Sequence, residues 1–134
     1  MPHEADEPKE RSRPRYRMAA AAALGWLGMY VHNVADLPHL TLASPENLVP
    51  GLIWLLLLGL WWAKPSRTLP AYLLMTWGLL NLVGGFATVI PLPIWPFKPE
   101  QSLRHYTFHV LYALTQLPLL ALVRRELSHG YPDD

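Results

Sequence analysis

Four side chains of types that can bind metal ions occur as two pairs, each with a spacing of four positions on an apolar segment. His32 and Asp36 stand near the end of the first such segment, and His105 and His109 stand near the start of the last. Residues at this spacing lie on one face of an α-helix, about one turn apart. Imidazole and carboxylate groups are ligands for Zn²⁺, Cu²⁺ and Fe²⁺. The two pairs therefore predict a transition-metal site, provided that the two segments are neighbours.

Further polar residues are candidates to support this site through hydrogen bonds to the ligands. Two of them continue the helical face of His109, and the others lie in the first segment, the loop after it and the two middle segments. The supporting set is Asn33, His39, Glu46, Asn81, Tyr112 and Gln116. If the metal kept an open position for water, Glu46 would be the general base of a small membrane hydrolase. The chain carries no nucleophile elbow or phosphate-binding loop, so catalytic residues stay unassigned and a non-enzymatic role is favoured.

A b-type haem is a second reading of the same residues. Its axial ligands would be His32 and His109. Gly25 and Gly28 stand on the same face as His32 and would leave room for the porphyrin. The basic residues at that end, which would meet the propionates, are Lys98 and Arg104. Close helix packing accounts for the glycines equally well, so the simple ion is preferred.

Four apolar runs position these groups. They cover about residues 18–37, 45–63, 70–92 and 99–127. A bilayer core of ~30 Å requires about 20 helical residues, and the stretch "LIWLLLLGLWWA" is apolar on all sides, unlike the helices of a soluble protein. The sequence therefore predicts an all-α integral membrane protein, a four-helix antiparallel bundle. In such a bundle the first and last helices are usually adjacent.

The basic residues predict the orientation of the bundle. Lys and Arg precede the first run, stand between the second and third, and follow the fourth. Short loops rich in these residues stay in the cytoplasm, so both termini are expected there, in a bacterial or archaeal plasma membrane. Loops 38–44 and 93–101 then face outward. Residues 1–17 and 128–134 have little to bury and are expected to be disordered cytoplasmic tails.

The depth of the two pairs in the membrane agrees with a shared site. With a rise of ~1.5 Å per residue, His32 and His109 both lie roughly 8–9 Å below the outer edge. By the same count Asp36 and His105 lie close to that edge. Antiparallel neighbouring helices would therefore bring the pairs level with each other. A signal peptide cleaved near Ala43 would remove the first pair, but the polar stretch before that residue is long for a cleavage region.

Two alternatives require no chemistry. Hydrogen bonds between His and Asp near the membrane interface can simply tie helices together. The third run carries Gly78, Asn81, Gly85 and Thr88 on one face, a pattern typical of close helix packing. If this face met another protein, the chain would be a structural or assembly subunit of a larger membrane complex, or a homo-oligomer.

Composition excludes several other classes. The chain has no cysteine, which excludes disulfides and thiolate metal sites. Its net charge is +1, and no basic patch is combined with stacking aromatic residues, so nucleic-acid binding has no support. The middle of each apolar run lacks Asp, Glu, Lys and Arg, which argues against a voltage sensor or a buried-carboxylate antiporter.

Overall fold

The structure, a computed structural model, describes residues 12–64, 66–96 and 98–128. Within these ranges the chain is all-helical. Its helices are α1 (Ser12–Asp36), α2 (Pro45–Ala63), α3 (Thr68–Ala87) and α4 (Leu103–Ser128). Helix α1 therefore begins inside the segment that was expected to be a tail. The remainder of the two expected tails, residues 1–11 and 129–134, lies outside the described residues.

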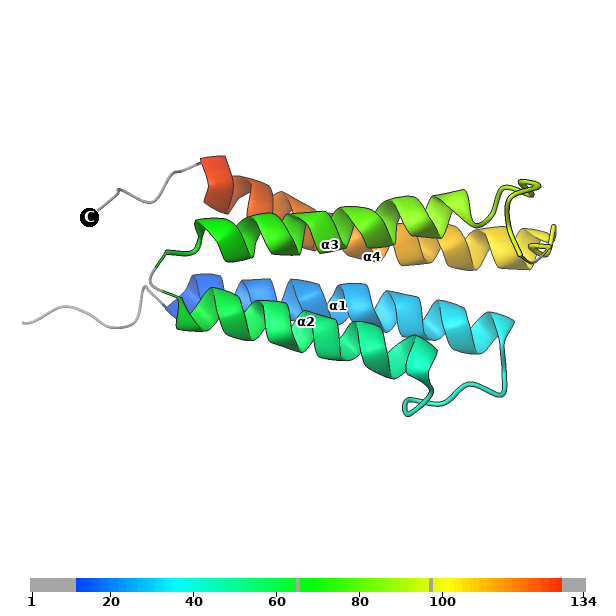
Figure 1. Cartoon of the computed structure of the whole chain (residues 1–134), viewed down its shortest axis with the longest axis horizontal. Coiled ribbons are helices and arrows are strands. Elements are labelled where there is room, and N and C mark those ends of the chain that lie inside the picture. Colours follow the sequence, from blue (N-terminus) through cyan, green and yellow to red (C-terminus); the bar gives the residue numbers. More distant parts are fainter. Residues whose placement is uncertain (1–11, 65, 97, 129–134) are drawn as a thin grey trace, which may run out of the picture.

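The four helices lie alongside one another (Figure 1). The α1–α2 and α3–α4 loops are at one end of the molecule, and the α2–α3 connection is at the other, where α1 begins and α4 ends. Helix α4 packs extensively against both α1 and α3, whereas α2 makes smaller contacts with α1 and α3. The first and last helices are thus neighbours, as expected.

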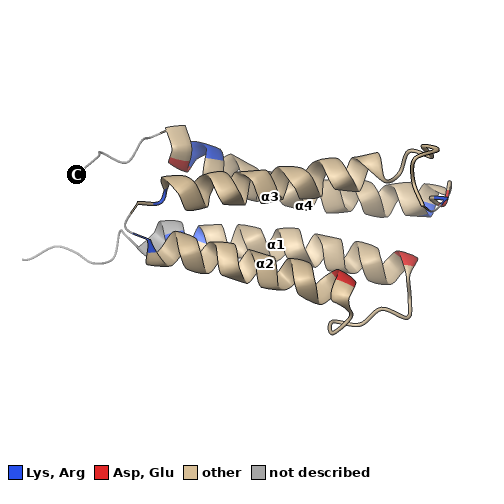
Figure 2. Ribbon diagram, viewed as in Figure 1, with Lys and Arg blue, Asp and Glu red and all other residues tan. Residues whose placement is uncertain are grey.

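Three of the helices in the described ranges, α2, α3 and α4, are long and apolar enough to cross a membrane. Helix α1 is not among them, and it carries Arg13, Arg15 and Arg17 in its first two turns and His32, Asn33 and Asp36 in its last two. Figure 2 shows the charged residues at the helix ends and in the loops, with none along the middle of the helices. The apolar middle of α1 therefore lies between a basic end and the end where the predicted site lies.

The start of α4 differs from the expected one at Pro99. The hydroxyl oxygen of Ser102 accepts a hydrogen bond of 3.2 Å from the backbone N–H of His105. A serine that pairs with a free N–H of the first turn is a preferred N-cap, so the helix begins at Leu103. His105 and His109 consequently occupy the first two turns of α4.

Glycines let α1 approach α4 closely. A Cβ atom at Gly28 would lie 2.8 Å from Cβ of Thr115, and one at Gly25 would lie 3.0 Å from Oε1 of Gln116. The side-chain amide of Gln116, which is fully buried, donates a 2.9 Å hydrogen bond to the carbonyl of Gly25. Gln116 therefore ties the two helices together here and is not near the ligand pairs.

The small-residue face of α3 is filled by α4. A Cβ at Gly78 would lie 2.8 Å from Cδ2 of Leu120, and one at Gly85 would lie 3.0 Å from Cδ1 of Tyr112. The hydroxyl of Tyr112 donates a 2.6 Å hydrogen bond to Oδ1 of Asn81. At these positions the face packs against α4 within the chain, and an assembly partner stays a prediction.

Substitution of Gly28 by alanine tests the α1–α4 contact. Since the clash is with the Cβ of Thr115, rotation of that side chain cannot relieve it, and the helices must separate. We expect Gly28→Ala to destabilise the protein by about 1–3 kcal/mol, the usual cost of overpacking, and to lower the melting temperature in detergent. Gly59→Ala is the matched control, because a Cβ there meets no atom within 4 Å. Equal melting temperatures for the two variants would contradict this packing.

Candidate metal centre

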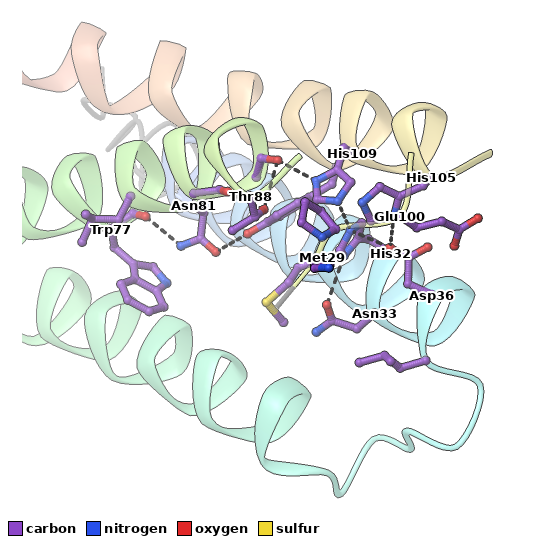
Figure 3. A pocket seen from close by; sticks show the side chains of 17 residues that line it. Met29, His32, Asn33, Asp36, Trp77, Asn81, Thr88, Glu100, His105 and His109 are labelled. Carbon is purple, nitrogen blue, oxygen red and sulfur yellow. Dashed lines mark hydrogen bonds and ion pairs between the residues drawn. The ribbon is translucent and has the colours of Figure 1, made fainter. Parts of the chain in front are cut away.

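The two predicted pairs converge at the end of the molecule that carries the α1–α2 and α3–α4 loops (Figure 3). His32 and Asp36 come from the last turns of α1, and His105 and His109 from the first turns of α4. Each offers one ligand atom, and these atoms all lie within 4.8 Å of one another. Around an ion with bonds of about 2.0–2.1 Å, tetrahedral ligand atoms are about 3.3 Å apart. Small side-chain movements therefore suffice to bring the four atoms to one ion.

The contacts within the cluster are close. Nε2 of His32 is 2.9 Å from Nε2 of His109. Oδ2 of Asp36 is 2.6 Å from Nδ1 of His105 and 3.3 Å from Nε2 of His32. The ring of His109 packs edge to face against both other imidazoles, with centroids 4.1 Å and 4.3 Å away. The expected levels are thus confirmed: His32 meets His109, and Asp36 meets His105.

The proton on His109 is fixed by the backbone of α3. Nδ1 of His109 lies 2.5 Å from the carbonyl oxygen of Gly85. A carbonyl can only accept, so Nδ1 must carry the hydrogen. The Nε2 atom of neutral His109 is therefore an unprotonated nitrogen whose lone pair faces the cluster.

A chain of amides fixes the proton on His32 in the same way. The carbonyl of Thr41 accepts a 2.8 Å hydrogen bond from Nδ2 of Asn47, which orients that amide. Oδ1 of Asn47 then accepts from Nδ2 of Asn33 at 2.9 Å, and Oδ1 of Asn33 faces Nδ1 of His32 at 3.1 Å. Since Oδ1 is an acceptor, Nδ1 of His32 carries the hydrogen. Neutral His32 therefore also presents an unprotonated Nε2.

Two lone pairs consequently face each other across 2.9 Å. This arrangement is repulsive unless a proton or a cation lies between the nitrogens. Histidines that bind metals almost always donate their other ring N–H to a carbonyl or carboxylate. His32 and His109 do so, since their Nδ1–H groups face the carbonyl oxygens of Asn33 and Gly85. The surroundings of His32 and His109 are therefore suited to a cation held between the two nitrogens, and a proton shared between them is the alternative.

Asp36 and His105 add three buried atoms without a hydrogen-bond partner among the described residues, Oδ1 of Asp36 and both ring nitrogens of His105. Nδ1 of His105 lies 2.6 Å from Oδ2 of Asp36, which leaves Nε2 of His105 and Oδ1 of Asp36 without such a contact. Burial of an unpaired polar atom is costly, and coordination of a metal ion by these two atoms would remove the cost.

The other supporting residues divide into three groups. Asn33 accepts a hydrogen bond from the predicted ligand His32. The ring of Tyr112 lies beside that of His32, with centroids 5.7 Å apart, and its hydroxyl donates a hydrogen bond to Asn81. Glu46 takes part only through its carbonyl, which accepts from Nδ2 of Asn33 at 3.3 Å. Its side chain is exposed, so its position gives the general-base reading no support. Gln116 binds α1 deeper in the molecule, and the side chain of His39 is exposed on the α1–α2 loop.

Asn47, the centre of the amide chain, was not among the residues predicted to support the site. It is fully buried and belongs to the first turn of an apolar helix. Its role could have been predicted from its position as a single asparagine in an apolar helix, because a buried amide needs hydrogen-bond partners.

The residues do not fit a haem between His32 and His109. Two axial nitrogens bound to one iron on opposite sides would be about 4 Å apart, with metal–nitrogen bonds of about 2.0 Å, and a macrocycle would separate the rings. Here the nitrogens are 2.9 Å apart and the rings are in edge-to-face contact. The space that Gly25 and Gly28 were expected to leave is taken by Gln116 and Thr115.

Comparison of the chain with family models, curated proteins and solved structures finds no match. What the site does must therefore be argued from its own residues.

The proton positions can be measured directly. In metal-free protein labelled with ¹⁵N-histidine, we expect His32 and His109 to show a protonated Nδ1 and an unprotonated Nε2 at neutral pH. Asn33→Leu removes the acceptor for His32 and should give this ring mixed protonation, while His109, held by a backbone carbonyl, stays unchanged. A protonated Nε2 on both rings of the unaltered protein would contradict the assignment.

Proposed function

We propose that the protein is a small antiparallel four-helix membrane protein that binds one divalent transition-metal ion at its outward-facing end. The ligands are His32, Asp36, His105 and His109. The observation that carries the proposal is the pair of imidazole lone pairs held face to face at 2.9 Å by neighbouring groups that fix both protons on the far side.

The same observation favours a metal site over a contact that only ties α1 to α4. A purely structural pair would direct an N–H group of one ring at an acceptor of the other. Here the N–H group of His32 is directed at Asn33 on its own helix, and that of His109 ties α4 to the Gly85 carbonyl of α3, so neither is directed across the α1–α4 contact. Such orientation costs stability in the metal-free protein, and a cation that binds between the rings offsets the cost.

The donor set indicates the class of metal. Three imidazole nitrogens and one carboxylate suit Zn²⁺, Cu²⁺ or Fe²⁺, whereas Mg²⁺ and Ca²⁺ prefer oxygen ligands. Asp36 has two roles in this arrangement. Its Oδ2 lies against Nδ1 of His105 and orients that ring, while its unpaired Oδ1 is available to the ion.

The charge distribution supports the proposed orientation in the membrane. Lys64, Arg124 and Arg125 belong to the end where α1 starts and α4 finishes, as do Arg15 and Arg17 of α1 (Figure 2). Segments rich in Lys and Arg stay on the cytoplasmic side. The metal cluster lies at the opposite end, so it would face the cell exterior.

Metal analysis of the purified protein tests the proposal. We expect about one ion per chain after loading with Zn²⁺ or Cu²⁺, because the cluster supplies one set of ligands. His109→Ala should weaken binding by more than the 10- to 100-fold that loss of a supporting hydrogen bond costs. His39→Ala is the matched control, since this histidine lies at the same end but outside the cluster, and it should bind as the unaltered protein does.

Three results would overturn the proposal. One is a chain that takes up no ion under any of these loading conditions. Another is equal loss of metal in His39→Ala and His109→Ala. The third is a haem absorption band in the purified protein that disappears in His109→Ala.

A further inference from the structure

A cavity of about 740 Å³ begins at the metal cluster and extends along α3 as far as Trp77. Polar groups are concentrated at one end of it, where His32, His109 and Asp36 form part of the wall. Towards the other end the wall includes the apolar side chains of Met29 and Leu80, and the polar groups of Asn81 and Tyr112 there are hydrogen-bonded to each other. A space with a polar head and an apolar body matches an amphiphile better than a soluble anion or a metal ion alone.

The wall of the cavity is exposed in two places. Helices α2 and α3 meet where the ring of Trp54 packs against Trp77, with centroids 6.3 Å apart. Beyond this point α2 diverges from α3 (Figure 3), and no residue of α2 borders the cavity. Leu80 and Gly84 are exposed on α3, and Lys98 and Glu100 are exposed at the loop end. In a protein that spans the membrane, the α3 side would face the acyl chains of the lipids, so a ligand could enter from the bilayer.

Charge indicates the head group. A divalent ion on three neutral imidazoles and one carboxylate leaves the loaded site with one net positive charge. Lys98 and Glu100, which also line the cavity, offset each other. An anionic oxygen donor is therefore attracted to the ion, and transition metals accept such a donor as an additional ligand.

We propose that the cavity binds a fatty acid, with the carboxylate on the metal ion and the acyl chain along α3. This inference rests on the proposed function, because the ion provides the attraction for the head group.

Gly84 offers a way to fill the cavity without disturbing the ligands. It lines the cavity, and a Cβ added there meets no atom within 4 Å. A leucine at this position would occupy the space intended for the acyl chain. Gly59 on α2 is the matched control, because it is equally open and lies away from this cavity.

The experiment uses the full chain in detergent, loaded with Co²⁺, whose visible spectrum reports its coordination. Oleic acid is the ligand and methyl oleate is the control, since the ester lacks the anionic head. We expect oleic acid to change the cobalt spectrum and methyl oleate to leave it unchanged. Gly84→Leu should bind cobalt normally and weaken the oleic acid response about tenfold or more, a loss of about 1.4 kcal/mol. Gly59→Leu should respond as the unaltered protein does.

The outcomes separate the two proposals. If cobalt binds but oleic acid never alters its spectrum, the fatty-acid site is wrong and the metal site stands. If Gly84→Leu and Gly59→Leu respond alike, or methyl oleate acts as oleic acid does, the fatty-acid site is also wrong. If cobalt does not bind at all, the metal site is wrong and the fatty-acid proposal, which depends on it, is wrong as well.

Discussion

The close approach of α1 to α4 is the constraint on which the rest of the structure depends. Two glycines on α1 remove the side chains that would keep the helices apart, and Gln116 binds the backbone of α1 at this point. Because a helix is rigid over several turns, contact at Gly25 and Gly28 sets the distance between the helices further along. That distance is what brings Nε2 of His32 to Nε2 of His109.

The polar end of the bundle and the opposite, apolar end have different roles in stability. Large side chains such as Trp61, Leu74 and Leu119 are fully buried towards the apolar end, where packing holds the helices together. The polar end instead buries imidazoles, a carboxylate and amides, which contribute little unless their hydrogen-bonding groups are paired. The fold is thus stabilised at one end, which leaves the other end free to keep a cluster of groups that could hold a metal ion.

Much of this arrangement was predictable from the sequence, because helix periodicity, the length of the apolar runs and the order of the helices constrain it. The rise per residue was enough to predict that His32 lies at the same height along the bundle as His109, and Asp36 at the same height as His105. The start of α4 was predicted wrongly. The sequence placed it at Pro99, whereas Ser102 caps the helix and it begins at Leu103. The role of Asn47 and the cavity beside α3 also escaped prediction. The role of Asn47 depends on how the start of α2 meets α1 and the α1–α2 loop, and the cavity depends on how far α2 diverges from α3. Periodicity within one helix determines neither.

The amide chain that ends at His32 begins outside the helices, at the carbonyl of Thr41 on the exposed α1–α2 loop. The shape of that loop therefore sets the protonation pattern of an imidazole buried behind it. Linkage makes this relation reciprocal. If the cluster binds an ion as proposed, whatever rearranges the exposed loop would change the affinity for that ion by a certain factor, and occupancy by the ion would change the loop equilibrium by the same factor.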